Sequence, residues 1–132
     1  MAKKVSVREF MSAPVITGKK EESIQSVANK MKDHHVGIIV VVNAKGSIDG
    51  VISERDILNK VVALGRDVKT TSVREIMQTK VITGTPSMTD VEAAAMFMKH
   101  KVKKLPIVER NKLVGIITQT DILKLYALKW AL

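Results

Sequence analysis

The chain lacks cysteine and has few aromatic residues. Without cysteine, disulfide frameworks, thiolate zinc sites and cysteine nucleophiles are excluded. Aromatic residues make up 3% of the chain and hydrophobic residues 45%, so we expect an aliphatic core. The longest apolar run, Val36 to Val42, is too short to cross a membrane, and no apolar segment of a signal peptide follows the first residues. We therefore expect a soluble, cytoplasmic protein with no membrane partner.

Acidic residues are also scarce, 13 against 22 lysines and arginines, which gives a formal net charge of +9. The excess is spread along the chain: residues 1–66 carry 11 basic and 7 acidic side chains, and residues 67–132 carry 11 and 6. A positive field favours anionic partners, from nucleotides to nucleic acids. Because aromatic side chains for base stacking are nearly absent and the cations form no tail, nucleic-acid binding is the second interpretation.

The dominant feature of the sequence is an internal repeat. Three segments recur: 6–11 as 72–77, 15–18 as 81–84, and 50–58 as 115–123. The first two pairs share one offset, which equals half the length of the chain, so the repeat accounts for nearly the whole protein. We expect a first repeat at 1–66 and a second at 67–132, joined near 65–72, with no room for a separate catalytic domain.

Each repeat predicts the same order of elements. Ser-Val-Arg-Glu has the pattern of a helical capping box and opens a short helical turn. An extended segment at Val15-Ile16 or Val81-Ile82, an amphipathic helix, a two-stranded hairpin and a closing helix follow, which gives an α/β fold of two β-α-β-β-α units. We expect the closing helices to run from Asp56 to Leu64 and from Asp121 to about Leu132. In the first amphipathic helix the expected apolar face is Ile24, Val27, Ala28 and Met31, and in the second it is Val91, Ala94, Ala95 and Met98.

The repeated nonamer, Gly-apolar-apolar-Ser/Thr-x-x-Asp-Ile-Leu, resembles the signature of the cystathionine-β-synthase (CBS) domain, and the chain resembles a tandem pair of CBS domains, or Bateman module, over residues 5–126. Met-x-x-x-Val-Ile-Thr and Leu105-Pro106-Ile107-Val108 add to the likeness. The resemblance implies that the repeats pack sheet to sheet about a pseudo-twofold axis. It also implies two clefts between them that bind adenosine-containing ligands, and pairing of modules into a disc-shaped homodimer.

The chemistry of such a site is visible in the two Ser/Thr-x-x-Asp motifs. The carboxylates of Asp56 and Asp121 suit the cis-diol of a ribose, because a carboxylate accepts two hydrogen bonds at once. The hydroxyls of Ser53 and Thr118, with backbone N–H groups at the helix start, suit phosphate oxygens. Val51 and Ile116 would offer apolar surface to a purine. By resemblance, further residues line the clefts: Ala13, Pro14, Val15, Gly37, Ile38, Thr79, Lys80, Val81, Lys104, Leu105 and Pro106.

The two clefts are expected to differ in ligand preference. Arg55 in the first motif stands where the second has Thr120, and Lys104 stands where the first repeat has Ile38. Arg55 and Lys104 are candidates to neutralise phosphate. The expected ligands are AMP, ADP or ATP, with NAD and S-adenosylmethionine as alternatives. A competing interpretation is that both motifs are ordinary helix caps, which stabilise a helix by about 1 kcal/mol without any ligand.

Catalysis and metal binding are not indicated. Asp56 and Asp121 belong to separate clefts, and no nucleophile–base pair appears. The adjacent His34 and His35 diverge by about 100° on a helix and cannot readily share a metal ion. The last helix is apolar nearly all round, and we expect its face with Tyr126 and Trp130 to contact a partner chain. The sequence therefore predicts a regulatory module that binds an adenine nucleotide and signals to another protein by a change of conformation.

Overall fold

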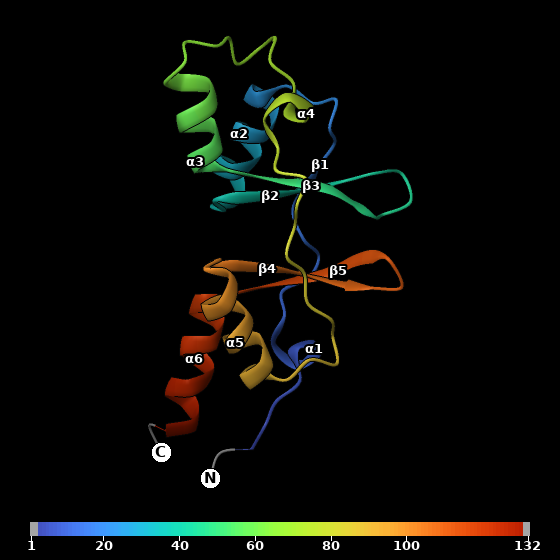
Figure 1. Ribbon diagram of the computed structural model, residues 1–132, viewed down its shortest axis with the longest axis vertical. Helices are drawn as coiled ribbons and strands as arrows, with labels where there is room; N and C mark the ends of the chain where they lie inside the picture. Colours follow the sequence, from blue (N-terminus) through green and yellow to red (C-terminus); the bar gives the residue numbers. More distant parts are fainter. Residues whose placement is uncertain (1–2, 131–132) are drawn as a thin grey trace. The chain divides into compact units, whose positions relative to one another are not determined.

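A computed structural model describes residues 3–130, and of residues 129 and 130 it describes the backbone alone. The chain forms two compact units (Figure 1). The continuous unit is Ile16–Val81; the split unit joins the residues up to Val15 to those from Ile82 onward. Both contain helices and strands, so the expected α/β class with two repeated units is confirmed.

The continuous unit has a three-stranded sheet in the order β1-β2-β3. Strand β1 (Thr17–Gly18) is parallel to β2 (Ile38–Val42), and β2 is antiparallel to β3 (Ile48–Ser53). Figure 1 shows the helices of this unit on one face of the sheet. They are α2 (Ile24–His34), α3 (Glu54–Ile57), a π-helical turn η1 (Leu58–Val62) and α4 (Val73–Ile76).

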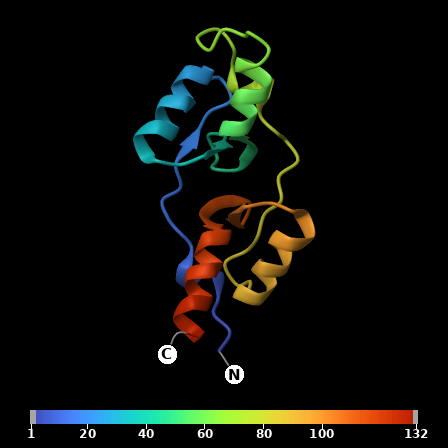
Figure 2. The same cartoon turned by 90° about the vertical axis from the view of Figure 1, so that its left-hand side faces the viewer.

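The split unit repeats this plan with a shorter sheet. Strands β4 (Lys104–Glu109) and β5 (Lys112–Thr118) form an antiparallel hairpin. The first extended segment pairs with it only through a parallel bridge from Gly84 to Ile107, so the strand expected at Val81-Ile82 is reduced to one bridge. Helices α5 (Asp90–His100), α6 (Gln119–Trp130) and the short α1 (Val7–Phe10) complete the unit, as the turned view also shows (Figure 2).

The compact units are displaced from the sequence repeats. The continuous unit begins at Ile16 and ends at Val81, so it starts and finishes later in the chain than the repeat at 1–66. The first helix of each repeat therefore belongs to the compact unit that holds most of the other repeat. Val7 of α1 is buried with Phe97 and Leu105, and Val73 of α4 is buried with Ile24 and Ile39. Each core is thus completed by a segment from the other repeat.

The expected aliphatic cores are present in both units. Their largest fully buried side chains are isoleucine, leucine and valine, which the β-branched strands and helix faces supply. In the continuous unit the fully buried residues include Ile24, Val27, Ile39, Val41, Ile52, Val61 and Val73. In the split unit they include Val7, Ala93, Leu105, Ile107 and Ile117, with Phe97 4% exposed.

The buried face of α5 differs from the expected one. Val91 is 51% exposed and Met98 is 80% exposed, so the face predicted from them is wrong. The buried residues are Asp90, Ala93 and Phe97. They stand where the first repeat has Ile24, Val27 and Met31, at the same offset that relates Ser6 to Ser72, and a buried aspartate takes the place of the isoleucine. The register of the repeat therefore continues into α5 without a shift, and the carboxylate of Asp90 occupies a buried position that the hydrophobic pattern does not reveal.

The closing helices begin earlier than expected, at Glu54 and Gln119 rather than at the aspartates. In the continuous unit the helix changes to a π-turn at Leu58 and ends at Val62, and the turn after it closes at Gly65, whose φ is +67°. In the split unit α6 stays α-helical through Trp130. No helix within residues 3–130 is long and apolar enough to span a membrane.

Candidate functional site

The Asp56 site lies where β3 passes into α3, and we define it by Ser53, Asp56, Lys60 and Gln78. The Asp56 carboxylate accepts the backbone N–H of Ser53 at 2.9 Å, and the Ser53 hydroxyl accepts the backbone N–H of Asp56 at 3.1 Å. This reciprocal pair is a capping box, so the interpretation of the motif as a helix cap is structurally correct. Asp56 itself is only 5% exposed.

Two further side chains hold the Asp56 carboxylate. The Gln78 amide nitrogen lies 3.1 Å from Oδ1 and 3.2 Å from Oδ2. Lys60 Nζ lies 3.2 Å from Oδ1 and 3.4 Å from the carbonyl oxygen of Ile76, to which it donates. Burial raises the pKa of Asp56, but the hydrogen bonds from Ser53, Gln78 and Lys60 outweigh it and hold the pKa below its ordinary value. The carboxylate is therefore ionised at neutral pH.

Gln78 is placed by the backbone of β3. The Gln78 N–H donates to the Val51 carbonyl at 2.8 Å, and the Val51 N–H donates to the Gln78 carbonyl at 2.9 Å. Glycine is required beside this bridge, because a Cβ on Gly50 would lie 2.6 Å from the Gln78 carbonyl oxygen. The segment after α4 thus runs along the strand that leads to Asp56.

The Asp121 site lies where β5 passes into α6, and we define it by Ser12, Thr118, Asp121 and Leu125. The Asp121 carboxylate accepts the Thr118 N–H at 2.8 Å, and the Thr118 hydroxyl accepts the Asp121 N–H at 3.1 Å. Ser12 and Ile116 exchange backbone hydrogen bonds of 2.9 and 3.1 Å. Ser12 therefore has the backbone position here that Gln78 has at the Asp56 site.

The other sequence-predicted residues fall into two groups. Gly37 and Ile38 adjoin the Asp56 site, because the Gly37 carbonyl accepts the Glu54 N–H at 3.0 Å and Ile38 pairs with Ser53. Lys104 pairs with Thr118 in the other unit. The segments after the short helices are assigned by unit: Thr79, Lys80 and Val81 belong with Asp56, whereas Ala13, Pro14 and Val15 belong with Asp121.

Exposure separates these residues further. Arg55 and Thr120, in the first turns of α3 and α6, are exposed, and so are Ala13, Pro14, Thr79 and Lys80. Val51, Ile116 and Lys104 are half-buried. Leu105 is fully buried in the core of the split unit, so its side chain packs inward. Pro106 is also buried and pairs with Ile116.

Sequence reasoning missed Gln78 and Lys60. A signal existed for each: Lys60 lies four residues after Asp56, the spacing at which helical side chains meet, and Gln78 stands where the first repeat has Ser12. Their contact with Asp56 depends on how α4 and η1 pack, which the local pattern does not contain. His34 and His35 end α2, and no three His, Asp or Glu side chains among the described residues are grouped to hold a metal ion.

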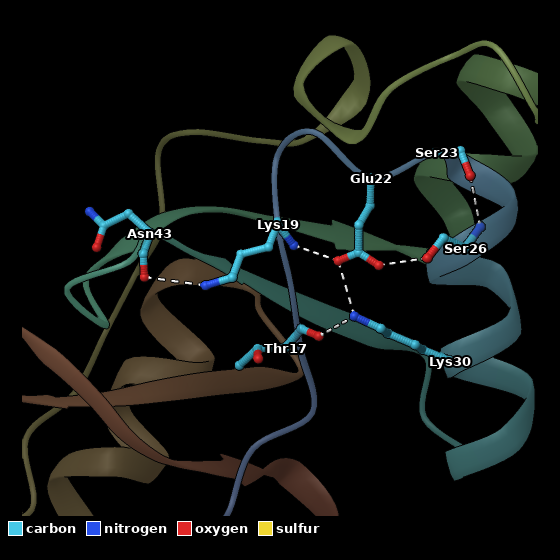
Figure 3. A network of polar contacts seen from close by, with 7 residues as sticks. All are labelled: Thr17, Lys19, Glu22, Ser23, Ser26, Lys30 and Asn43. Carbon is cyan, nitrogen blue, oxygen red and sulfur yellow. Dashed lines mark hydrogen bonds and ion pairs between the residues drawn. The ribbon is translucent and has the colours of Figure 1, made fainter.

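A second polar network lies at the start of α2 (Figure 3). The Glu22 carboxylate accepts the Lys19 N–H and the Ser26 hydroxyl, both at 2.6 Å, and Lys30 Nζ at 3.0 Å. Lys30 also donates to the Thr17 carbonyl at 2.9 Å, which ties the helix to β1. Burial raises the pKa of Glu22, but the hydrogen bonds from Ser26, Lys19 and Lys30 lower it below its ordinary value. The network fixes the loop between β1 and α2.

The face of α6 that was expected to meet a partner divides in two. Tyr126 is half-buried and packs against the core of the split unit, since it lies four residues after the buried Ile122. The large apolar residues that are exposed on the described part of this helix are Leu123 and Leu128, 66% and 70% exposed. The side chain of Trp130 lies outside the part of the chain that the structure describes.

Comparisons with known proteins place this geometry in a family. The chain is 38% identical over 117 residues to the CBS domain-containing protein YhcV of Bacillus subtilis, a match that covers 89% of this chain and 82% of that protein. A putative signal-transduction protein with CBS domains from Burkholderia ambifaria superposes with a TM-score of 0.86 at 29% identity, covering 96% of each chain. The CBS domain pair of protein MJ0100, in complex with 5-methylthioadenosine and S-adenosylmethionine, superposes with a TM-score of 0.87 at 27% identity, covering 96% of this chain and 99% of that one.

The family assignment follows from the sequence match along most of the chain. The profile of the CBS domain family matches residues 7–63 and 73–128, one match in each repeat. Both matched segments end in the closing helix that follows a Ser/Thr-x-x-Asp corner. The chain therefore belongs to the CBS domain family and carries two CBS domains in tandem.

Proposed function

We propose that this protein is a regulatory module that binds an adenosine-containing compound through Asp56 and Asp121 and passes a change of conformation to a partner protein. The observation that carries the proposal is that each unit presents a carboxylate at the same strand-to-helix corner, beside a Ser or Thr hydroxyl. The ligands of the similar domain pair of MJ0100 are both adenosine compounds, which supports the same chemistry here.

The chemistry follows from the groups at each corner. An ionised carboxylate accepts two hydrogen bonds and so suits the 2′- and 3′-hydroxyls of a ribose. Half-buried Val51 and Ile116, on the strands that lead to the aspartates, offer apolar surface to the purine. Arg55 near Asp56 and Lys104 near Thr118 supply the cations for a ligand that carries phosphate.

A regulatory role requires only that the ligand binds one conformation more tightly than another. CBS domains are in general regulatory and non-catalytic, and in this chain both aspartates are already engaged as helix caps. Binding at a cap changes the contacts of the helix that follows it, which gives the module a means of signalling. We therefore propose no reaction for this protein.

Calorimetric titration with AMP, ADP, ATP, NAD and S-adenosylmethionine tests the proposal. Repeating it on Asp56→Asn and Asp121→Asn assigns each binding event to a site, since asparagine keeps the shape of the cap but loses the charge. The melting temperature of each variant without ligand serves as the control for folding. Saturable binding that is weakened in one or both variants supports the proposal; binding of no compound, or binding unchanged in both variants, rejects it.

The formal charge of +9 favours a second candidate, binding of nucleic acid. Its signature is that the logarithm of the affinity falls steeply and linearly as the logarithm of the salt concentration rises. The reason is that lysine and arginine side chains of the protein displace counterions from the nucleic acid. The same purified protein, titrated with a labelled single-stranded oligonucleotide at three salt concentrations, separates the two. Weak affinity for the oligonucleotide, with a shallow dependence on salt concentration, would leave binding of a small ligand as the proposed function.

A further inference from the structure

We propose that Gln78 and Lys60 compete with the ligand for Asp56, so that the Asp121 site fills first and the Asp56 site second. This inference rests on the proposed function. The Asp56 site has Gln78 and Lys60, which the Asp121 site lacks, and these two residues account for the difference in affinity between the two sites.

The Asp56 carboxylate has no accepting capacity left. Its Oδ1 contacts the Gln78 amide at 3.1 Å and Lys60 Nζ at 3.2 Å. Its Oδ2 contacts the Ser53 N–H at 2.9 Å, the Ser53 hydroxyl at 3.1 Å and the Gln78 amide at 3.2 Å. A carboxylate has about four lone-pair positions, and five contacts fill them. A ribose diol can therefore bind only by displacing Gln78, Lys60 or both.

The Asp121 carboxylate is less engaged. Its Oδ2 accepts the Thr118 N–H at 2.8 Å. Within residues 3–128, whose side chains the structure describes, no donor is within hydrogen-bond distance of its Oδ1. Asp121 is half-buried rather than buried, so this oxygen is open to an incoming hydroxyl. A diol that binds here replaces solvent and breaks no bond within the protein.

The difference arises from side chains on matched backbones. Ser12 and Gln78 make the same paired backbone hydrogen bonds to Ile116 and Val51, but the serine hydroxyl is too short to repeat the reach of the glutamine amide. Leu125 lies four residues after Asp121, as Lys60 does after Asp56, and carries no donor. Two substitutions in each unit therefore exchange the two environments.

Displacement at Asp56 has a structural consequence that is absent at Asp121. Gln78 follows α4, and Lys60 bonds both Asp56 and the last carbonyl of α4, that of Ile76. A ligand that takes the Asp56 carboxylate therefore releases the contacts that join α3, η1 and α4. Occupation of the second site changes the continuous unit, whereas occupation of the first leaves the protein's own hydrogen bonds intact.

The test uses adenosine as the probe, because it carries the diol but no phosphate to bind Lys60. In the wild-type protein we expect two affinities, the tighter one lost in Asp121→Asn. In the double variant Gln78→Ser with Lys60→Leu the weaker affinity should rise about tenfold. This factor corresponds to the free energy of a hydrogen bond to a charged group, reduced because both side chains are partly exposed. In the reciprocal variant Ser12→Gln with Leu125→Lys the tighter affinity should fall by a similar factor.

Two controls sharpen the test. 2′-Deoxyadenosine lacks half of the diol, so its binding should gain little from Gln78→Ser with Lys60→Leu. Carbon-13 NMR titration of the Asp56 carboxyl, without ligand, should show a higher midpoint in that variant if the contacts exist in solution. Because Gln78 is exposed and Lys60 is nearly half exposed, the variant Gln78→Ser with Lys60→Leu should fold.

The outcomes are distinct. An unchanged weaker affinity in the double variant overturns the inference, and so does a tighter site that is lost in Asp56→Asn rather than Asp121→Asn. An unchanged carboxyl midpoint overturns it even before any ligand is added. If no variant binds adenosine although the midpoint of the Asp56 carboxyl moves, the proposed function is overturned. The inference is then overturned as well, because no ligand competes with Gln78 and Lys60 for Asp56.

Discussion

Asp90, which is fully buried in α5, accepts a 3.0 Å hydrogen bond from the backbone N–H of Val5, 85 residues earlier in the chain. The backbone N–H of Asp90 donates in return to the Val5 carbonyl at 2.8 Å. In the continuous unit Ile24 has the equivalent place, and its N–H donates to the Thr71 carbonyl at 3.0 Å. The same backbone contact thus occurs in both units, and only the split unit adds a carboxylate to it.

Replacing Asp90 should destabilise the protein more than replacing an exposed aspartate. Asp90→Ala leaves the half-buried N–H of Val5 without its side-chain acceptor and opens a gap at a fully buried position, so we expect a loss of about 2–3 kcal/mol. Asp33→Ala is the matched control, because its carboxylate is 63% exposed and lies 3.8 Å from Lys32; it should change stability by less than about 0.5 kcal/mol. Urea denaturation measures both, and equal losses would contradict the role of Asp90.

Gly50 should tolerate alanine less well than Gly65. A Cβ on Gly50 would lie 2.6 Å from the carbonyl oxygen of Gln78, a backbone atom that is fixed by its bridge to Val51. We expect Gly50→Ala to cost about 2–3 kcal/mol through overpacking. At Gly65 nothing lies within 4 Å, and only the φ of +67° opposes a side chain, at about 1 kcal/mol. Thermal unfolding of both variants measures the two losses of stability. A larger loss for Gly65→Ala than for Gly50→Ala would contradict the prediction.

Acid should destabilise the folded protein over the range in which its helix-capping carboxylates take up protons. Backbone hydrogen bonds from Ser6, Ser72 and Thr89 are the largest causes that lower the pKa values of Glu9, Glu75 and Glu92 below 4.5. The unfolded chain then binds these protons at a higher pH than the folded chain, so stability falls as the pH drops through about 4.5 toward 3.

Denaturation at pH 7, 5, 4 and 3 measures this dependence. Glu75→Gln keeps the shape of the capping residue but removes its titration, so the variant should lose less stability than the wild type between pH 5 and 3. A loss in the variant as large as that of the wild type would show that Glu75 has no part in the pH dependence.

Replacing Glu22 and Lys30 together should cost less stability than the sum of the two single replacements. The second repeat has Met88 and Met96 at the equivalent positions. Glu22→Met alone leaves Lys30 without its carboxylate, and Lys30→Met alone leaves Glu22 without its cation. A double-mutant cycle should give a coupling of about 1 kcal/mol, and a coupling near zero would mean that the 3.0 Å contact contributes no stability.

The homodimer expected from the sequence should depend on the exposed leucines of the closing helices. Leu58 is 58% exposed and Leu123, its equivalent in the second repeat, is 66% exposed. Leu58→Glu or Leu123→Glu should shift the protein toward monomer in sedimentation equilibrium, because a buried charge opposes association. Met98→Glu is the control, since Met98 is 80% exposed on α5. Equal behaviour of all three variants would exclude the closing helices as the interface.

The repeat and the local signals carried most of the fold. Capping boxes at Ser6 and Ser72, strands in β-branched runs and the face of Ile24, Val27 and Met31 were all predictable, because each depends on residues near one another in sequence. The face of α5 was not, because a buried aspartate that bonds a distant backbone N–H looks like a surface residue in the sequence alone.

The candidate site divides in the same way. Ser53, Asp56, Thr118 and Asp121 form capping boxes at strand-to-helix corners, which their spacing indicated. That Gln78 would reach Asp56 was not predictable, since 22 residues separate them and the contact depends on the bridge between the Gln78 backbone and Val51. The pairing of each aspartate with a segment from the other repeat has the same origin.

The exchange of first helices between the repeats bears on how such a chain could have arisen. A single ancestral repeat of this kind would have lacked Val7 or Val73 in its own core, and two copies would have supplied them to each other. Gene duplication and fusion would then have joined two molecules that already depended on mutual exchange. A gene divided after codon 66 should yield halves that are soluble only when expressed together, whereas a fragment that begins at Ile16 and ends at Val81 keeps its core in one piece.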